Sequence, residues 1–156
     1  MKIAPGRKHR MKSVIELDID VPQAKLAELF TDPRRNPEWM DDLERIEPVA
    51  GNPGEPGSTY RLIPKRGNLI FVARVISREL PTEARLVLEA PSVSVAVTGK
   101  FFALSEKTTR LVSEEVFTFK GIFGKIVGFF AEGSIKDAHR RHMESFKRFA
   151  ERRNAP

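Results

Sequence analysis

"SVIELDIDVPQAKLAELFTDPRRNPEWMDDL", residues 13–43, changes its hydrophobic period part-way along. At its start Ile15, Leu17 and Ile19 alternate with a second set of mostly charged residues. A period of two with one apolar face is typical of a half-buried strand. From Asp20 onward the apolar residues recur at helical spacing. The stretch therefore predicts a strand that leads directly into helical structure.

Two proline signals divide the helical part into two short helices. Asp20 is a suitable N-cap with Pro22 in the first turn, and the Asp-Pro pair at 32–33 ends this helix. The Asn-Pro pair at 36–37 repeats the signal, so Trp39, the only tryptophan, falls in the first turn of a second helix. A helix this short is held by packing, which makes Trp39 its expected anchor.

After residue 43 the pattern becomes a series of strands separated by short turn signals. Connections this short favour antiparallel neighbours. Together with the first strand, these segments predict about seven strands. The expected strands cover residues 45–51, 58–64, 69–80, 85–90, 93–104 and 109–119.

From Gly121 the hydrophobic period becomes helical, in two stripes that slip out of line near Gly133. A glycine in a helix interior costs about 1 kcal/mol and is a frequent kink site, so we expect two helical segments, the second long and C-terminal. The first stripe is Phe123, Val127, Phe130 and Ser134, and the second is Ala131, Ile135, Ala138, His142, Phe146 and Phe149.

This order of elements resembles the helix-grip fold of the START-like superfamily, also called SRPBCC or Bet v 1-like. The resemblance is carried by residues 16–51, 54–62 and 108–119, which look like the family's opening strand and helices, its glycine-rich approach to the third strand, and its last strand. Within the superfamily, the chain is most similar to the polyketide cyclase/dehydrase and lipid-transport branch. The match spans roughly residues 13–152.

The resemblance implies an α+β helix-grip fold: a sheet of about seven antiparallel strands wraps around a long C-terminal helix and leaves an elongated apolar cavity. It implies a single domain at 13–153 after a basic tail at 1–12. The two short helices would close one end of the cavity with Trp39 as a plug, while a plain core position for Trp39 is the alternative. The glycine-rich residues 121–133 would frame the cavity mouth.

Composition excludes several classes of site. The 156 residues include no cysteine, so disulfides, thiolate nucleophiles and zinc-thiolate sites are excluded. Three histidines without metal-ligand spacing predict no metal, and no phosphate loop or other cofactor motif is present, so no cofactor is expected. No apolar run approaches the roughly 20 residues that a bilayer requires, and no secretory signal opens the chain, so we expect a cytoplasmic protein.

Polar residues in the last two strands are candidates for the chemistry of the cavity. If Ser105 lies opposite Thr108, then Lys100 lies opposite Ser113, and Glu115 opposite Thr98. Lys100 and Glu115 would then be diagonal neighbours on one face. A shift of one residue in register would reverse this assignment for one of the strands.

Glu115 and His142 are the candidate catalytic residues, because a buried carboxyl or imidazole can move protons. A surface position for Glu115 and a core position for His142 are the alternatives. The expected ligand-binding residues are Trp39, Phe71, Lys100, Phe102, Glu115, Phe117, Phe130, His142 and Phe146.

Three functions stay open. The first is binding or transport of a small hydrophobic ligand of lipid, polyketide or isoprenoid type. The second is a cyclase or dehydratase that uses Glu115 or His142 as acid or base. The third is a module that binds RNA or an anionic membrane through its basic surface, since the net charge is +6. No specific nucleic acid is expected as a partner, whereas transient membrane contact and a homodimer are left open.

Overall fold

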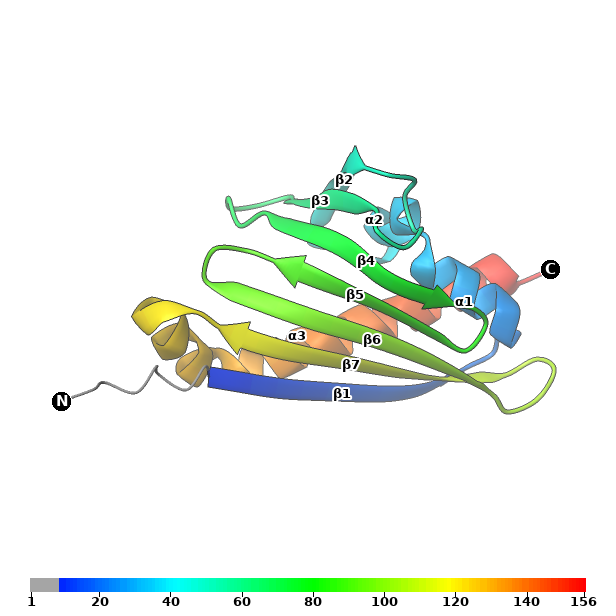
Figure 1. Cartoon of the computed structure of the whole chain (residues 1–156). Helices are drawn as coiled ribbons and strands as arrows, with labels where there is room; N and C mark the ends of the chain where they lie inside the picture. The colour runs from blue at the N-terminus through cyan, green and yellow to red at the C-terminus, as the bar shows by residue number, and fades with distance from the viewer. Residues whose placement is uncertain (1–8) are drawn as a thin grey trace.

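The computed structural model of the chain describes residues 9–156, without the side chains of residues 123–125 and 127–130. Short helices follow the first strand, and a long helix follows the last one (Figure 1). In chain order the elements are β1 (His9–Ile19), α1 (Gln23–Thr31), the 3-10 helix η1 (Pro33–Arg35), α2 (Asn36–Trp39), β2 (Leu43–Ala50), β3 (Thr59–Pro64), β4 (Phe71–Glu79), β5 (Glu83–Glu89), β6 (Val93–Ala103), β7 (Thr109–Phe119) and α3 (Gly121–Asn154).

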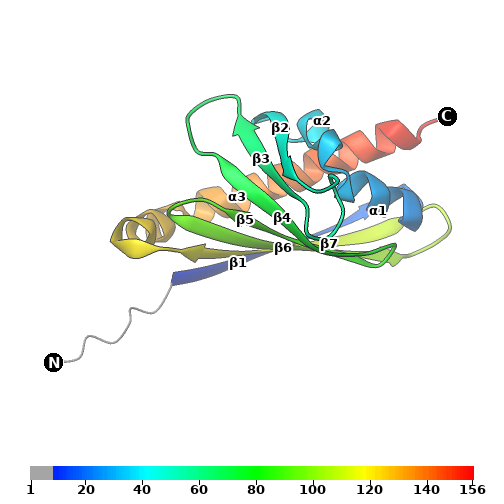
Figure 2. The same cartoon turned by 45° about the horizontal axis from the view of Figure 1, so that its top comes forward.

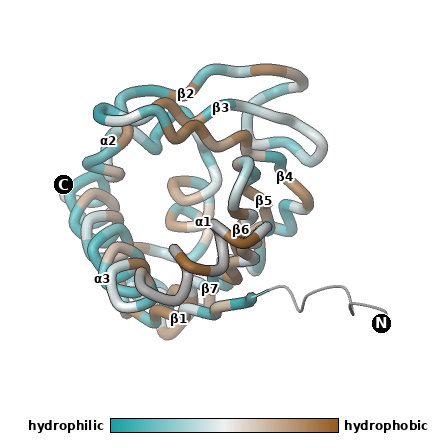
Figure 3. The backbone as a smooth tube through the Cα atoms, turned by 90° about the vertical axis from the view of Figure 1, so that its left-hand side faces the viewer, coloured by the Kyte–Doolittle hydropathy of each residue, from teal (hydrophilic) through white to brown (hydrophobic). Residues whose placement is uncertain are grey.

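The strands form one seven-stranded antiparallel sheet in the order β1-β7-β6-β5-β4-β3-β2. The first strand therefore lies beside the last, and the rest follow as a meander of short hairpins. All three α-helices lie on the same side of the sheet (Figure 2). Seen from the end, the sheet curls from β1 beside α3 round to β2 beside α2 (Figure 3). The predicted α+β helix-grip fold is confirmed.

Helix α3 is continuous, so the prediction of two segments with a break near Gly133 was wrong. The helix has 34 residues and runs through Gly133. A Cβ atom at Gly133 would meet nothing within 4 Å, so close packing is not the reason for a glycine there. Lys136 lies 3.2 Å from Glu132 one turn earlier, across the glycine, as in a regular helix. The helical propensity cost of one glycine is small beside the packing of so long a helix.

The short helices lie where they were predicted but have different caps. Pro22, rather than Asp20, occupies the N-cap position of α1, and the Asp20 carboxylate accepts a hydrogen bond from Thr108 in the β6–β7 turn. Asp32 caps η1 by accepting from the backbone N–H of Arg34. Helix α2 begins at Asn36, so that residue is inside the helix rather than its cap.

The packed core lies between α1, α2, the C-terminal half of α3 and the end of the sheet nearest to them. Trp39 is buried there, its ring stacked 6.3 Å from Phe30 and edge-on to Phe146 at 5.2 Å. Phe30 in turn packs directly over Gly99 in β6, where an added Cβ would come within 2.7 Å of its ring. Glycine at position 99 is therefore required for the close approach of α1 to the sheet.

The strand β1 begins at His9, before the domain start expected at residue 13, and its residues 9–12 pair with residues 116–119 of β7. Part of the basic N-terminal segment is thus an integral part of the sheet. Within the described part of the chain, no helix combines the length and the hydropathy that crossing a membrane would take.

Candidate functional site

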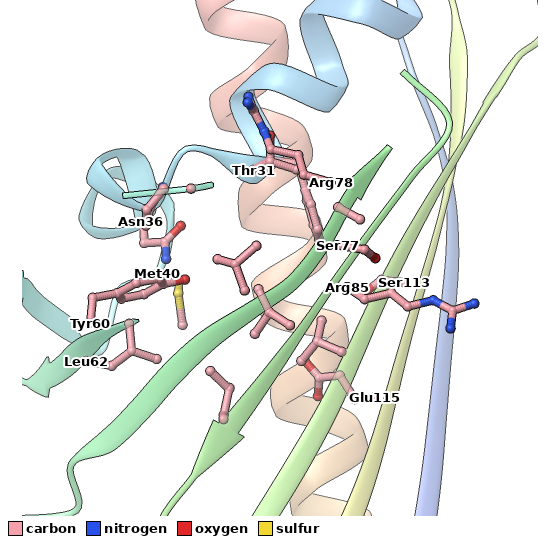
Figure 4. A pocket seen from close by; sticks show the side chains of 18 of the residues that line it. Thr31, Asn36, Met40, Tyr60, Leu62, Ser77, Arg78, Arg85, Ser113 and Glu115 are labelled. Atoms are coloured by element: carbon pink, nitrogen blue, oxygen red, sulfur yellow. The ribbon is translucent and has the colours of Figure 1, made fainter. Parts of the chain in front are cut away.

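Two adjoining cavities lie between α3 and the concave face of the sheet. The larger has a volume of about 700 Å³ and is bounded by β3 to β7, the α2–β2 turn and the middle of α3. The smaller, of about 90 Å³, lies under α1 and α2 (Figure 4). The residues that line both cavities are Met40, Leu62, Leu88 and Glu115.

The walls follow from strand alternation. Inward positions of neighbouring strands pair directly across the sheet, so apolar residues form continuous rows on the concave face. Glu115 occurs in such a row, where the alternation of β7 would otherwise place an apolar side chain. One row is Tyr60, Ala73, Leu88, Val95 and Phe117, and the next is Val75, Leu86, Val97 and Glu115.

Glu115 is the carboxyl that lines both cavities. Its side chain is only 18% exposed, and the nearest basic atom among the described side chains is Nε2 of His139, 3.7 Å from its Oε1. Burial raises the pKa of Glu115 to about 7, while the positive charge of His142 acts in the opposite direction. A carboxyl in this state can either hold or release a proton near neutral pH.

His139 is the histidine buried against the sheet, and it was not among the predicted site residues. Its ring is fully buried, with Nδ1 2.7 Å from the Ser13 hydroxyl and Nε2 3.0 Å from the Ser113 hydroxyl. Burial lowers the pKa of His139 to about 4, helped by the charges of His142 and Arg140. His139 is therefore neutral at physiological pH, and one ring nitrogen donates while the other accepts.

His142 lies at the border of the larger cavity, where its Nε2 donates to Oδ1 of Asp42 over 3.2 Å. This hydrogen bond raises the pKa of His142 and holds the pKa of Asp42 below its ordinary value. The pair connects α3 to the α2–β2 turn. The predicted stripe of Ile135, Ala138 and His142 lines the larger cavity and so faces the sheet. His139 and Met143 are buried beside it.

The predicted register of the last two strands was wrong by one residue. Lys100 pairs with Val112 rather than Ser113, and Glu115 pairs with Val97. The turn is longer than assumed, since the backbone N–H groups of Leu104 and Ser105 both donate to Thr108. Because adjacent side chains alternate across a sheet, Lys100 and Phe102 point to the convex face, both exposed. Neither lines a cavity.

The other predicted ligand residues are distributed unequally. Phe71 and Phe117 line the larger cavity, and Trp39 lines the smaller one as well as being part of the core. Phe146 is fully buried in the packed core and lines neither. The side chain of Phe130 lies outside the described residues, as does most of the glycine-rich segment expected to frame the mouth.

Sequence analysis missed Tyr60 and Asn36, which border the smaller cavity together (Figure 4). Burial raises the pKa of Tyr60 to about 12, an effect that its hydrogen bond with the Asn36 side chain partly offsets. Among the described side chains, no three His, Asp or Glu residues come close enough to hold a metal ion.

No protein family model and no curated protein matches the sequence. Solved structures do match it over nearly the whole chain.

The ZhuI aromatase/cyclase from Streptomyces sp. R1128 superposes with a TM-score of 0.78 at 16% identity, covering 94% of this chain and 97% of that one. Protein TTHA0849 from Thermus thermophilus gives 0.73 at 15% identity, covering 93% and 100%. Norcoclaurine synthase from Thalictrum flavum, in complex with dopamine and hydroxybenzaldehyde, gives 0.66 at 14% identity, covering 96% and 95%. These similarities show that the chain has the helix-grip fold of Bet v 1-like, or SRPBCC, proteins.

Proposed function

We propose that the chain binds a small, largely apolar molecule of lipid, polyketide or isoprenoid type between α3 and the concave face of the sheet, as a carrier in the cytoplasm. The observation that carries the proposal is the cavity of about 700 Å³. Its volume is within the roughly 300–1,000 Å³ of ligand pockets, and 11 of its 18 lining residues are aliphatic or aromatic.

The packing around the cavity supports the same conclusion. A cavity of this size is not a packing defect, because protein interiors are filled to crystal-like density and empty space costs stability. The elements that enclose it lie far apart in the sequence, from the α2–β2 turn and the β3–β4 hairpin to α3. A bound molecule would restore the missing contacts. Proteins of this fold with bound small molecules, such as norcoclaurine synthase with dopamine and hydroxybenzaldehyde, agree with the proposal.

The test compares two variants that differ in the face of β6 they alter. Val95→Trp places an indole into the larger cavity, whereas Ala96→Trp places the same side chain on the exposed convex face. Titration with the dye anilinonaphthalene sulfonate measures saturable binding to each folded protein. We expect the Val95 variant to bind at least tenfold more weakly than wild type and the Ala96 variant to bind within twofold.

Two results would overturn the proposal. Equal dye binding by wild type and both variants would place the dye on the surface. Absence of any saturable binding, together with no apolar molecule in mass spectra of the protein extracted under native conditions, would leave the cavity without a binding function. Cooperative unfolding of each variant in denaturant serves as the control for folding, since a molten state also binds this dye.

The position of Glu115 supports a second candidate function, that of an acid-base enzyme of the cyclase type. A buried carboxyl whose pKa is about 7 lines both cavities, so it touches any molecule bound at their junction. One positioned acid or base contributes about 10² to 10⁴ in rate. His142 is the weaker of the two candidates, because its Nε2 is already engaged by Asp42.

This candidate is tested with probe substrates that can cyclise or condense, namely a short β-polyketone and the pair dopamine and hydroxybenzaldehyde. If wild type converts a probe, Glu115→Gln should reduce turnover at least 100-fold, the lower limit for loss of such a group, and leave binding of the probe within about threefold. Unchanged turnover in Glu115→Gln would assign the acid to another residue.

A further inference from the structure

The inference concerns the junction of the two cavities, where Glu115 lies. Of the four residues that line both cavities, Met40, Leu62 and Leu88 are apolar, and Glu115 is the only one that ionises. Figure 4 shows Glu115 across the pocket from Asn36 and Tyr60, with its carboxyl directed from the strand into the pocket. A molecule that extends from one cavity into the other must pass this carboxyl.

The Glu115 carboxyl makes no hydrogen bond with the side chains that the structure describes. His139 is nearest at 3.7 Å, too long for a hydrogen bond, and both of its ring nitrogens are already bonded to Ser13 and Ser113. The carboxyl keeps 18% of its surface exposed, so a ligand that covers it removes its remaining water. That costs roughly 1–3 kcal/mol unless the ligand brings a polar group to hydrogen-bond distance. The carboxyl is thus arranged to meet a polar group on the ligand.

The sizes of the two cavities fix where that polar group lies on the ligand. A dry cavity of about 150 Å³ holds benzene, with six carbon atoms. By that ratio, the smaller cavity of about 90 Å³ has room for roughly three carbon atoms beyond Glu115. The remaining, larger part of the ligand occupies the other side. The polar group is therefore internal and not at the end of the molecule.

A hydroxyl suits this position better than a cation or a carbonyl. It can donate to a carboxylate and accept from a carboxylic acid, whereas a carbonyl can only accept. A ligand cation is not favoured either, since the acidic residues at the larger cavity are offset by basic ones and Asp42 is already bonded to His142. The basic residues that line the two cavities are Lys65, Arg66, Arg78 and Arg85, against Asp41, Asp42 and Glu115.

We propose that the ligand is a neutral secondary alcohol whose hydroxyl binds Glu115, with a short alkyl branch of about three carbons in the smaller cavity and a longer apolar branch in the larger one. This rests on the proposed function, because it names the class of molecule that the cavity binds.

The first experiment ranks isomers of equal composition: octan-1-ol, octan-3-ol and octan-4-ol, each competing with the dye for wild-type protein. Octan-3-ol and octan-4-ol can fill the smaller cavity while their hydroxyl meets Glu115, and octan-1-ol cannot. Since a buried methylene is worth about 0.8 kcal/mol, about fourfold in affinity, an internal alcohol that buries even one more methylene should bind at least about fourfold more tightly. Equal affinity, or tighter binding of octan-1-ol, would overturn the proposal.

The second experiment tests Glu115 itself with octan-3-ol and its methyl ether, which keeps the oxygen but lacks the donor. Wild type should prefer the alcohol by about tenfold, the ratio given by one net hydrogen bond. Glu115→Gln, which can still accept, should keep most of this preference, and Glu115→Leu should lose it. A preference that survives in Glu115→Leu would assign the hydroxyl to another residue.

The third experiment fills the smaller cavity. Ala84 lines the smaller cavity and not the larger one. Ala84→Leu should therefore remove the higher affinity of octan-3-ol relative to octan-1-ol. Ala96→Leu adds the same atoms on the convex face and should keep it. An advantage retained in Ala84→Leu would show that the branch lies elsewhere. If the dye binds in the cavity but no isomer is preferred, this inference fails while the proposed function stands; if nothing binds there, both fail.

Discussion

Two stretches of α3 face the same sheet and have opposite surroundings. Residues 143–150 pack tightly against α1, α2 and the ends of β1 and β6, whereas residues 135–142 face the larger cavity. The strands alternate in the same way in both regions, so the strands alone do not decide which region is filled. The two regions differ in whether side chains of α1 and α2 pack between α3 and the sheet. Phe30 and Trp39 fill the space beside residues 143–150, while the larger cavity lies beside residues 135–142.

The comparison indicates that stability and binding are located in different parts of one fold. The packed region contains Phe146, which touches the rings of Phe30, Trp39 and Phe149. The hollow region contains Phe117, whose ring has a partner only in Phe119 among the described aromatic residues and otherwise borders the cavity. Two phenylalanines of the same size therefore have very different amounts of contact to lose.

The largest expected effect is the difference between these two residues. Phe146→Ala should reduce the free energy of unfolding by about 4 kcal/mol, the usual cost of deleting a buried ring. Phe117→Ala should cost about 1–2 kcal/mol, because part of its surface already faces empty space, while weakening dye binding several-fold. Urea denaturation measures the first quantity and dye titration the second. Equal losses of stability would show that the two regions are packed alike.

A second prediction concerns the pH dependence of stability, which has opposite signs for two residues of the hollow region, Glu115 and His139. Glu115 in the cavity has a folded-state pKa of about 7, above its ordinary 4.5, so the folded chain keeps a proton that the unfolded chain releases. Its contribution to stability is present at low pH and is lost as pH rises from 4.5 to 7. His139 has a folded-state pKa of about 4, below its ordinary 6.5, so its contribution is lost as pH falls through that window. The two contributions oppose each other where the windows overlap.

Removing the Glu115 carboxyl should leave the contribution of His139 to the pH dependence of stability unopposed. For Glu115→Gln, the stability gain over wild type should grow by up to about 3 kcal/mol between pH 4.5 and 7.5, since each pKa unit corresponds to 1.36 kcal/mol. The measurement is urea denaturation of both proteins across this range. Glu114→Gln, on the convex face beside Lys12, is the matched control, and its difference from wild type should stay within about 0.5 kcal/mol. A Glu115 variant that parallels wild type would mean that the carboxyl is solvated.

The sequence was sufficient to predict the strands, the short helices and the long helix, because alternation, helical spacing and proline signals are local. The site was predicted only in part. Glu115 could be found, since it is a carboxylate among apolar inward positions of β7. The role of His139 could not, because its hydrogen-bond partners, Ser13 and Ser113, lie 126 and 26 residues away. Their small hydroxyls at inward strand positions were the one available signal of a polar group in the core.

The hydrophobic pattern could not determine the register in which β6 pairs with β7. Residues 105–108 form a turn signal, but whether the strands pair from Ser105 or Ala103 depends on which backbone groups close the turn. Both registers place apolar residues on one face, so the hydrophobic pattern does not distinguish them. The sequence pattern also left the rotation of α3 about its axis undetermined. His139 and His142 are about 60° apart on a helix, and both lie beside apolar neighbours.

The smallest expected effects follow from this register. Lys100→Ala and Phe102→Ala alter the convex face, where Phe102 is 50% exposed. Exposed substitutions usually change stability by no more than about 0.5 kcal/mol, and Phe102 should lose little more because half of its ring is already in water. Dye affinity should stay within twofold of wild type for both variants, in contrast to Phe117→Ala on the other face. A several-fold loss of affinity in either variant would place its side chain on the concave face and return the pairing of β6 with β7 to the register first predicted.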